Sequence, residues 1–106
     1  MFGKKKEAAP SPNANVLVIT GDLNMNYQII DSVFAMDSHT EGILSFADPG
    51  KAFVGVREQL RAKAISLGGN AVINCMFEYR VAVSEGLIKN SQVMEIFAYG
   101  TVVRTV

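Results

Sequence analysis

The strongest grouping of residues for chemistry is Asp37, His39 and Glu41, which alternate along the chain. Residues at positions i, i+2 and i+4 of an extended strand project to the same face. One imidazole and two carboxylates suit a divalent transition metal such as zinc, manganese, iron or nickel. The spacing makes these three residues candidate metal ligands if a strand extends that far, in a site that is weak unless a second chain contributes. The alternative is a polar loop with a lone histidine in solvent.

Cys75 is the only cysteine of the chain and lies between Ile73 and Phe77 in an apolar alternation. A single cysteine cannot form an intrachain disulfide. Burial raises the pKa of a thiol and makes it unreactive. His39, the only histidine, is distant in sequence and suggests no cysteine–histidine pair. We therefore expect Cys75 to pack as a small hydrophobic residue.

No other motif assigns a catalytic or cofactor-binding residue. The sequence contains no dinucleotide fingerprint, no Walker A loop and no nucleophile elbow. Residues 68–70, Gly-Gly-Asn, could pass for a phosphate loop, but a strand pattern follows them and no helix N-terminus is expected there. Glu78 and Arg80 predict a cross-strand salt bridge or an interface contact. The sequence therefore favours a non-enzymatic role but does not decide it.

The elements that must hold these residues begin with two β-rich runs, residues 16–20 and 27–36, which we expect to form a hairpin, followed by a loop over 38–47. A helix is predicted to begin at Pro49, after the N-cap residue Asp48. Its buried face recurs at helical spacing, and the glycines that follow supply a stop. That face consists of Phe53, Val56, Leu60, Ala64 and Leu67. Gly55 lies inside the helix at a cost of about 1 kcal/mol relative to alanine.

Two long alternating patterns complete the chain, over residues 70–83 and 93–106, with a hairpin loop over 84–91. Odd-numbered residues from Ala71 to Val83 are expected to share one face. The order β-β-α-β-β predicts a single α+β domain over 16–106, with one main helix and a mostly antiparallel sheet. Residues 1–15 contain three lysines and two prolines and are predicted to be a flexible tail.

Composition excludes several classes of function. The chain has 106 residues, ten basic and ten acidic, and its formal net charge is zero. Balanced charge excludes general, sequence-independent electrostatic binding to nucleic acid. No run of ~18 apolar residues is present to span a membrane, and no secretory signal follows the lysines near the start. A cytoplasmic protein is the expectation.

The segment LRAKAISLGGNAVINCMFEYRVAV, followed by VMEIFAYGTVVRT, resembles the YbjQ-type family of small bacterial proteins. The likeness lies in the helix end and the strand after it, with an aromatic at Tyr79, and in the closing residues 100–103. It departs at Gly69, where the family usually has alanine. The family is described as heavy-metal-binding domains of unknown function. The resemblance implies a ring-shaped homo-oligomer, typically a pentamer, whose partner is the chain itself.

The sheet faces independently predict self-association. The last strand has Met94, Ile96, Ala98 and Val102 on one face, and Val93, Phe97, Tyr99 and Val103 on the other. The second strand is predicted to have Ile29 and Val33 on one face and Ile30, Phe34 and Met36 on the other. One helix covers one face, so an apolar patch is left open.

We hypothesise an assembly module with any ligand bound between subunits. The alternative is a metal-binding protein. A small-molecule enzyme is a third possibility without a supporting feature.

Overall fold

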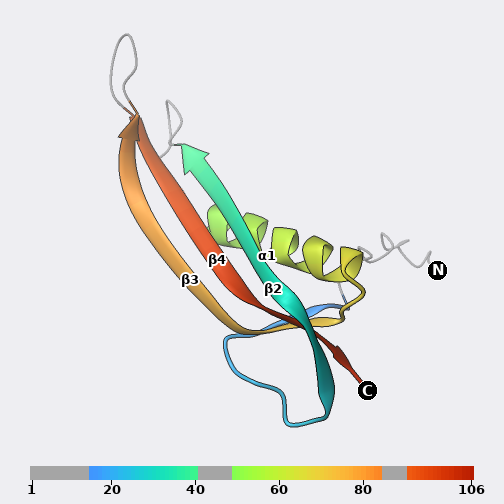
Figure 1. Cartoon of the computed structure of the whole chain (residues 1–106). Coiled ribbons are helices and arrows are strands. Elements are labelled where there is room, and N and C mark those ends of the chain that lie inside the picture. The colour runs from blue at the N-terminus through green and yellow to red at the C-terminus, as the bar shows by residue number, and fades with distance from the viewer. Residues whose placement is uncertain (1–14, 41–48, 85–90) are drawn as a thin grey trace, which may run out of the picture.

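The computed structural model describes residues 15–40, 49–84 and 91–106. The described chain folds into four strands and one helix in the predicted order β-β-α-β-β (Figure 1). Their bounds are β1 Leu17–Val18, β2 Tyr27–Thr40, α1 Pro49–Ser66, β3 Ala71–Ser84 and β4 Ser91–Thr105. The predicted tail lies almost wholly outside the described residues and stays a prediction.

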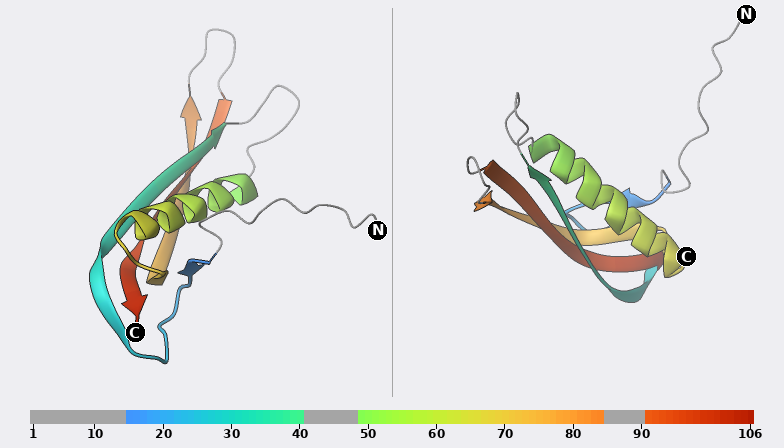
Figure 2. Two further views of the ribbon diagram at one scale, coloured as in Figure 1. Left: turned by 90° about the vertical axis from the view of Figure 1, so that its right-hand side faces the viewer. Right: turned by 90° about the horizontal axis from the view of Figure 1, so that it is seen from above.

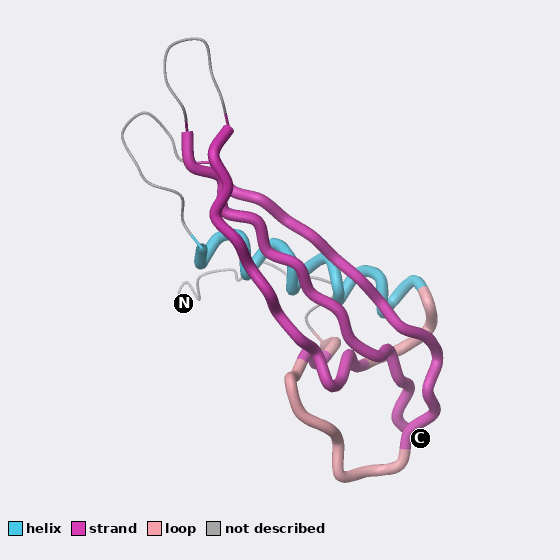
Figure 3. Tube along the Cα trace, turned by 60° about the vertical axis from the view of Figure 1, so that its left-hand side comes forward, coloured by secondary structure: helices cyan, strands magenta, loops and turns pink. Residues whose placement is uncertain are grey.

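The strands form one mixed sheet in the order β1-β3-β4-β2. β4 is antiparallel to both β2 and β3, and β1 pairs in parallel with the start of β3. The sheet is mostly antiparallel, as predicted, but the predicted hairpin of the first two strands is wrong. β1 and β2 lie at opposite edges of the sheet, and residues 19–26 connect them (Figure 3). The physical reason is length, because the 14 residues of β2 find far more partners along β4 than along a two-residue strand.

The helix begins at Pro49, as the sequence predicts, and ends in a Schellman motif. The N–H of Gly68 donates to the carbonyl of Ile65 at 2.9 Å, and the N–H of Gly69 donates to that of Ala64 at 2.8 Å. Gly68 has a φ of 86°, a backbone conformation that residues with a side chain rarely adopt. The glycine pair therefore terminates the helix by satisfying its last carbonyls.

The main core lies between the helix and one face of the sheet. The helix crosses β2 and β4 on that face (Figure 2). Its residues Ala52, Val56, Leu60 and Ala64 are fully buried, whereas Leu67, predicted to be buried, is exposed. The opposing sheet residues include Val33, Ala35, Ile96, Ala98 and Val102. Met94, Ile96, Ala98 and Val102, which were predicted to share one face of the last strand, all belong to this core.

Two β-bulges change which residues share a face. The register of β3 shifts between Ile73 and Met76, where Asn74 has a φ of 52°. The prediction of one face from Ala71 to Val83 is therefore wrong. Residues before the bulge join a second, smaller cluster on the opposite face, packed against Ile19, Leu23 and Tyr27; its buried members are Ala71, Ile73 and Val103.

The bulge in β2 lies between Ile29 and Asp31. Ile29 is opposite Val103 and Val33 is opposite Gly100, so Ile29 and Val33 lie on opposite faces and not on one, as predicted. An inserted residue reverses the alternation of every residue beyond it. Sequence periodicity alone does not reveal such an insertion.

A close contact explains the glycine inside the helix. A Cβ at Gly55 would lie 1.7 Å from the Oδ2 atom of Asp37. The carboxylate of Asp37 in β2 therefore occupies the space that a side chain at position 55 would need. Gly55 costs helix propensity but lets the helix approach β2 at the level of Asp37.

This contact predicts a coupling between Gly55 and Asp37. In the Asp37→Ala background, Gly55→Ala is expected to raise the free energy of unfolding by about 1 kcal/mol, the usual helix-propensity gain. In the wild-type background the gain is expected to vanish or reverse, because the carboxylate must leave its place. Urea unfolding of the four proteins measures both effects. Equal effects of Gly55→Ala in the two backgrounds would show that the contact is absent.

Candidate functional site

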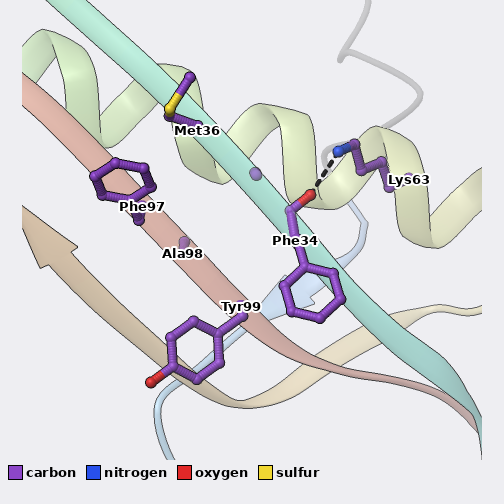
Figure 4. A pocket seen from close by; sticks show the side chains of 7 residues that line it. Phe34, Met36, Lys63, Phe97, Ala98 and Tyr99 are labelled. Carbon is purple, nitrogen blue, oxygen red and sulfur yellow. Dashed lines mark hydrogen bonds between the residues drawn. The ribbon is translucent and has the colours of Figure 1, made fainter.

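The sheet face away from the helix carries an apolar surface, here called the outer face, made by Phe34, Met36, Met76, Phe97 and Tyr99. Figure 4 shows the side chains of Phe34, Met36, Phe97 and Tyr99. In the register, Phe34 and Met76 are both opposite Tyr99, and Met36 is opposite Phe97. Cross-strand partners share a face. Phe34 is 63% exposed, which is high for a large apolar side chain. The predicted second apolar face of the sheet therefore exists.

A shallow hollow of about 420 Å³ lies on the outer face between β2 and β4. Its lining is mostly apolar, and the polar side-chain atoms among the lining residues are the hydroxyl of Tyr99 and the amine of Lys63 (Figure 4). Both tips already have partners, since Tyr99 donates to Glu78 and Lys63 donates to the carbonyl of Phe34. The arrangement offers apolar contact area and no convergent catalytic groups.

Charged residues border the outer face on the β3 side. Arg80 donates from Nε to Oε1 of Glu95 at 2.5 Å, and its guanidinium lies 5.8 Å from the centroid of the Phe97 ring. The hydroxyl of Tyr99 donates to Glu78 at 3.0 Å, and this bond raises the pKa of Tyr99. The cross-strand salt bridge predicted for this strand is therefore present, with Arg80 as the cation. An exposed ion pair of this kind contributes at most about 1 kcal/mol to the free energy of unfolding. Its main effect is to fix the position of the Arg80 side chain beside Phe97.

The free edge of β2 is capped by side chains of the helix. Gln59 donates from Nε2 to the carbonyl of Met36 at 2.9 Å, and Lys63 donates from Nζ to the carbonyl of Phe34 at 2.5 Å. These residues are one helical turn apart and satisfy alternate carbonyls of the edge strand. Such capping prevents another strand from pairing there. Sequence reasoning missed this role, because helical spacing of polar residues does not show that a strand edge lies beside them.

The edge of β3 is open over most of its length. β1 pairs only with Ala71 and Val72, and the last bond from the segment after β1 joins the N–H of Cys75 to the carbonyl of Ile19. Beyond that point, no strand of the described chain pairs with the edge of β3 that faces away from β4. The helix-side residues there, called the β3 strip, are strongly exposed: Tyr79 63%, Val81 52% and Val83 63%.

The three candidate metal ligands are only partly placed. β2 extends to Thr40, beyond the predicted end, so residues 38–40 belong to the strand and not to the expected loop. The rest of that predicted loop lies outside the described residues. Asp37 lies on the helix side of β2 beside Gly55, and the backbone of His39 is opposite Met94. The side chain of His39 and all of Glu41 lie outside the described residues. Among the residues that are described, no three acidic, histidine or cysteine side chains form a metal-binding group. The metal site stays a prediction.

Cys75 is fully buried in the main core, as expected. Desolvation raises the pKa of its thiol, and the nearby charge of Arg57 opposes this shift more weakly. A neutral, buried thiol is a poor nucleophile.

Comparison with known proteins identifies the fold. A crystal structure of a protein of unknown function from Pediococcus pentosaceus ATCC 25745, described as belonging to the DUF74 family, is similar to this chain. The TM-score is 0.69 at 24% sequence identity, and the match covers 86% of this chain and 98% of that chain. No family model and no curated protein matches the sequence. The α+β fold is therefore shared with a protein that has no assigned role. The helix of the described chain is not of the length and apolarity needed to cross a membrane.

Metal binding, if it occurs, is expected to depend on His39. His39→Ala and the double variant Asp37→Ala/Glu41→Ala should each remove stoichiometric metal from protein incubated with zinc and then dialysed. Elemental analysis measures the metal retained. We expect the wild-type protein to be mostly metal-free after dialysis against a weak chelator. One tightly held transition metal per chain would contradict that expectation.

Cys75 is expected to react with a thiol reagent only after unfolding. Native protein should label slowly, and protein in denaturant should label at once. Val54 is 61% exposed on the helix, so Val54→Cys in a Cys75→Ala background provides a matched thiol that should label rapidly. Cys75→Ala itself should cost about 1 kcal/mol of stability, as removal of a small buried group does. Rapid labelling of native Cys75 would show that the site is open.

Proposed function

We propose that this chain is the subunit of a homo-oligomeric ring and acts as a non-enzymatic assembly module in the bacterial cytoplasm. The observation that carries the proposal is the pair of open apolar surfaces, the outer face and the β3 strip. Their occupant is a second copy of the chain. Its net charge of zero imposes no overall repulsion between copies.

Element lengths support this proposal. A helix of 18 residues is about 27 Å long. A strand of 14 residues is about 47 Å long. One helix therefore cannot cover the long strands, and they extend past it (Figure 3). Large apolar side chains are exposed on both sides of the sheet, Phe34 and Met36 on the outer face and Tyr79, Val81 and Val83 on the helix side. This is more than isolated subunits usually expose.

The position of the two surfaces favours a ring over a two-fold dimer. Tyr79 and Val81 are opposite Ile96 and Met94, which belong to the helix-side core, so the β3 strip and the outer face lie on opposite sides of the sheet. A two-fold dimer uses one patch twice and leaves the other exposed. Contact between two different patches repeats from copy to copy and forms a ring when the rotation between neighbouring copies closes.

The number of subunits rests on the resemblance to the YbjQ-type family, which implies a pentamer. DUF74 is the YbjQ-like family, so the fold shared with a DUF74 protein of unknown function supports this resemblance. A ligand bound at the interface of the assembled form would lie where the two apolar surfaces meet.

Charge substitutions on the two faces of the sheet test this proposal. Phe34→Lys is expected to leave the subunit folded and to lower the native mass, because it places a charge on the outer face. Ile96→Lys is expected to abolish folding, because it buries an unpaired charge in the main core. Circular dichroism measures folding, and size-exclusion chromatography with light scattering measures mass.

Val54→Lys is the matched control. Val54 is as exposed as Phe34 but lies on the helix, away from both surfaces. This variant should keep the native mass of the wild type. If Phe34→Lys and Val54→Lys have the same native mass, the outer face is not an interface.

A further inference from the structure

A groove of about 600 Å³ lies on the helix side of the sheet, next to the end of β1. One wall is the segment from Val18 to Gly21, and the other is the first half of the helix with Phe53 and Arg57; Phe77 of β3 lies between them. The volume is within the range of small-molecule sites, roughly 300–1,000 Å³. All of these walls belong to one chain, so the groove does not depend on the proposed assembly.

The apolar part of the groove is built from two aromatic rings. The centroids of Phe53 and Phe77 are 5.8 Å apart, and the ring planes are tilted by 60°. Both residues are half-buried and pack against the main core, so their positions are held from behind. Part of the surface of each ring is exposed in the groove, where it can contact the apolar part of a ligand.

Arg57 supplies the only positive charge of the lining. The other arginines of the described chain are engaged: Arg61 pairs with Glu58, Arg80 with Glu95, and Arg104 donates to the carbonyl of Gly68. Arg57 is exposed and has no ion pair or hydrogen bond with a described residue. Its charge also acts on Cys75 below the groove. A guanidinium without a carboxylate partner, beside apolar walls, is complementary to an organic anion.

The backbone wall of the groove is fixed by the bulge in β3. The N–H of Asn74 donates to the carbonyl of Gly21 at 2.8 Å, and the N–H of Cys75 donates to that of Ile19 at 3.0 Å. The positive φ of Asn74 aims these donors at the segment after β1. Bulges of this kind often lie next to binding sites, and a wall held this way needs no ordering when a ligand enters.

We propose that this groove binds a small amphipathic carboxylate, whose anionic group pairs with Arg57 and whose apolar body lies against Phe53 and Phe77. A carboxylate accepts two parallel hydrogen bonds from a guanidinium, which fixes the orientation of the ligand. An uncharged molecule of the same shape gains the apolar contact but not this pairing.

Titration of the full chain with 2-naphthoate tests the site, with 2-naphthamide as the uncharged probe. Calorimetry should give an affinity for naphthoate that is about tenfold higher than for naphthamide. Arg57→Gln should reduce naphthoate affinity about tenfold and leave naphthamide affinity unchanged. Lys51→Gln removes the same charge from the same helix outside the groove and should change neither. In NMR spectra, naphthoate should shift the amide signals of residues 18–21 and 53–57.

Equal naphthoate affinities of wild type and Arg57→Gln would overturn the proposal. So would shifts confined to residues of the outer face, which would place the probe at a different apolar surface. Absence of naphthoate binding to the wild-type chain at millimolar concentration would also overturn it.

Discussion

The packing of one helix across β2 and β4 is the interaction on which the rest of the structure depends. Val56, Leu60 and Ala64 are fully buried in this contact, and all other features adapt to it. Gly55 admits the carboxylate of Asp37, and Gln59 and Lys63 cap the carbonyls of the β2 edge. The same packing limits the fold, because a single helix covers two strands and leaves the far half of β3 open.

The two edges of the sheet are therefore chemically different. The β2 edge has helix side chains bonded to its carbonyls, so it resists further pairing. The β3 edge carries Tyr79, Val81 and Val83 beside unpaired backbone and is open beyond the bulge. An open apolar edge promotes aggregation of an isolated protein, whereas in an assembling protein it can form part of an interface. The contrast between the two edges supports self-association in which the β3 strip, and not the β2 edge, contacts the outer face of the next copy.

The sequence predicts most of the fold but not the pairing of the first strand. The helix was predictable because Pro49, the spacing of buried residues and the Gly68–Gly69 stop all agree. The hairpin of the first two strands was wrong, because pairing between distant strands leaves no local signal. The bulges at Asn74 and before Asp31 were also invisible, since an inserted residue resembles any other member of an alternating run.

Predictability of the candidate sites follows the same division. The outer face was predicted because alternation in β4 is regular. The burial of Cys75 was predicted from its apolar neighbours Ile73 and Phe77, although the bulge places Ile73 on the opposite face. The groove at Arg57 was missed because its walls come from three segments that are distant in sequence. The metal ligands stay untested, because the side chain of His39 and Glu41 lie outside the described residues.

The mass of the wild-type protein in solution tests the assembly most directly. Sedimentation equilibrium at micromolar concentration should give a discrete multiple of 11.5 kDa, with a pentamer as the expected species. This multiple should persist on dilution, because it rests on two buried apolar surfaces per subunit. A compact species of 11.5 kDa across the same concentrations would contradict the assembly and would mean that the outer face and the β3 strip remain exposed to water.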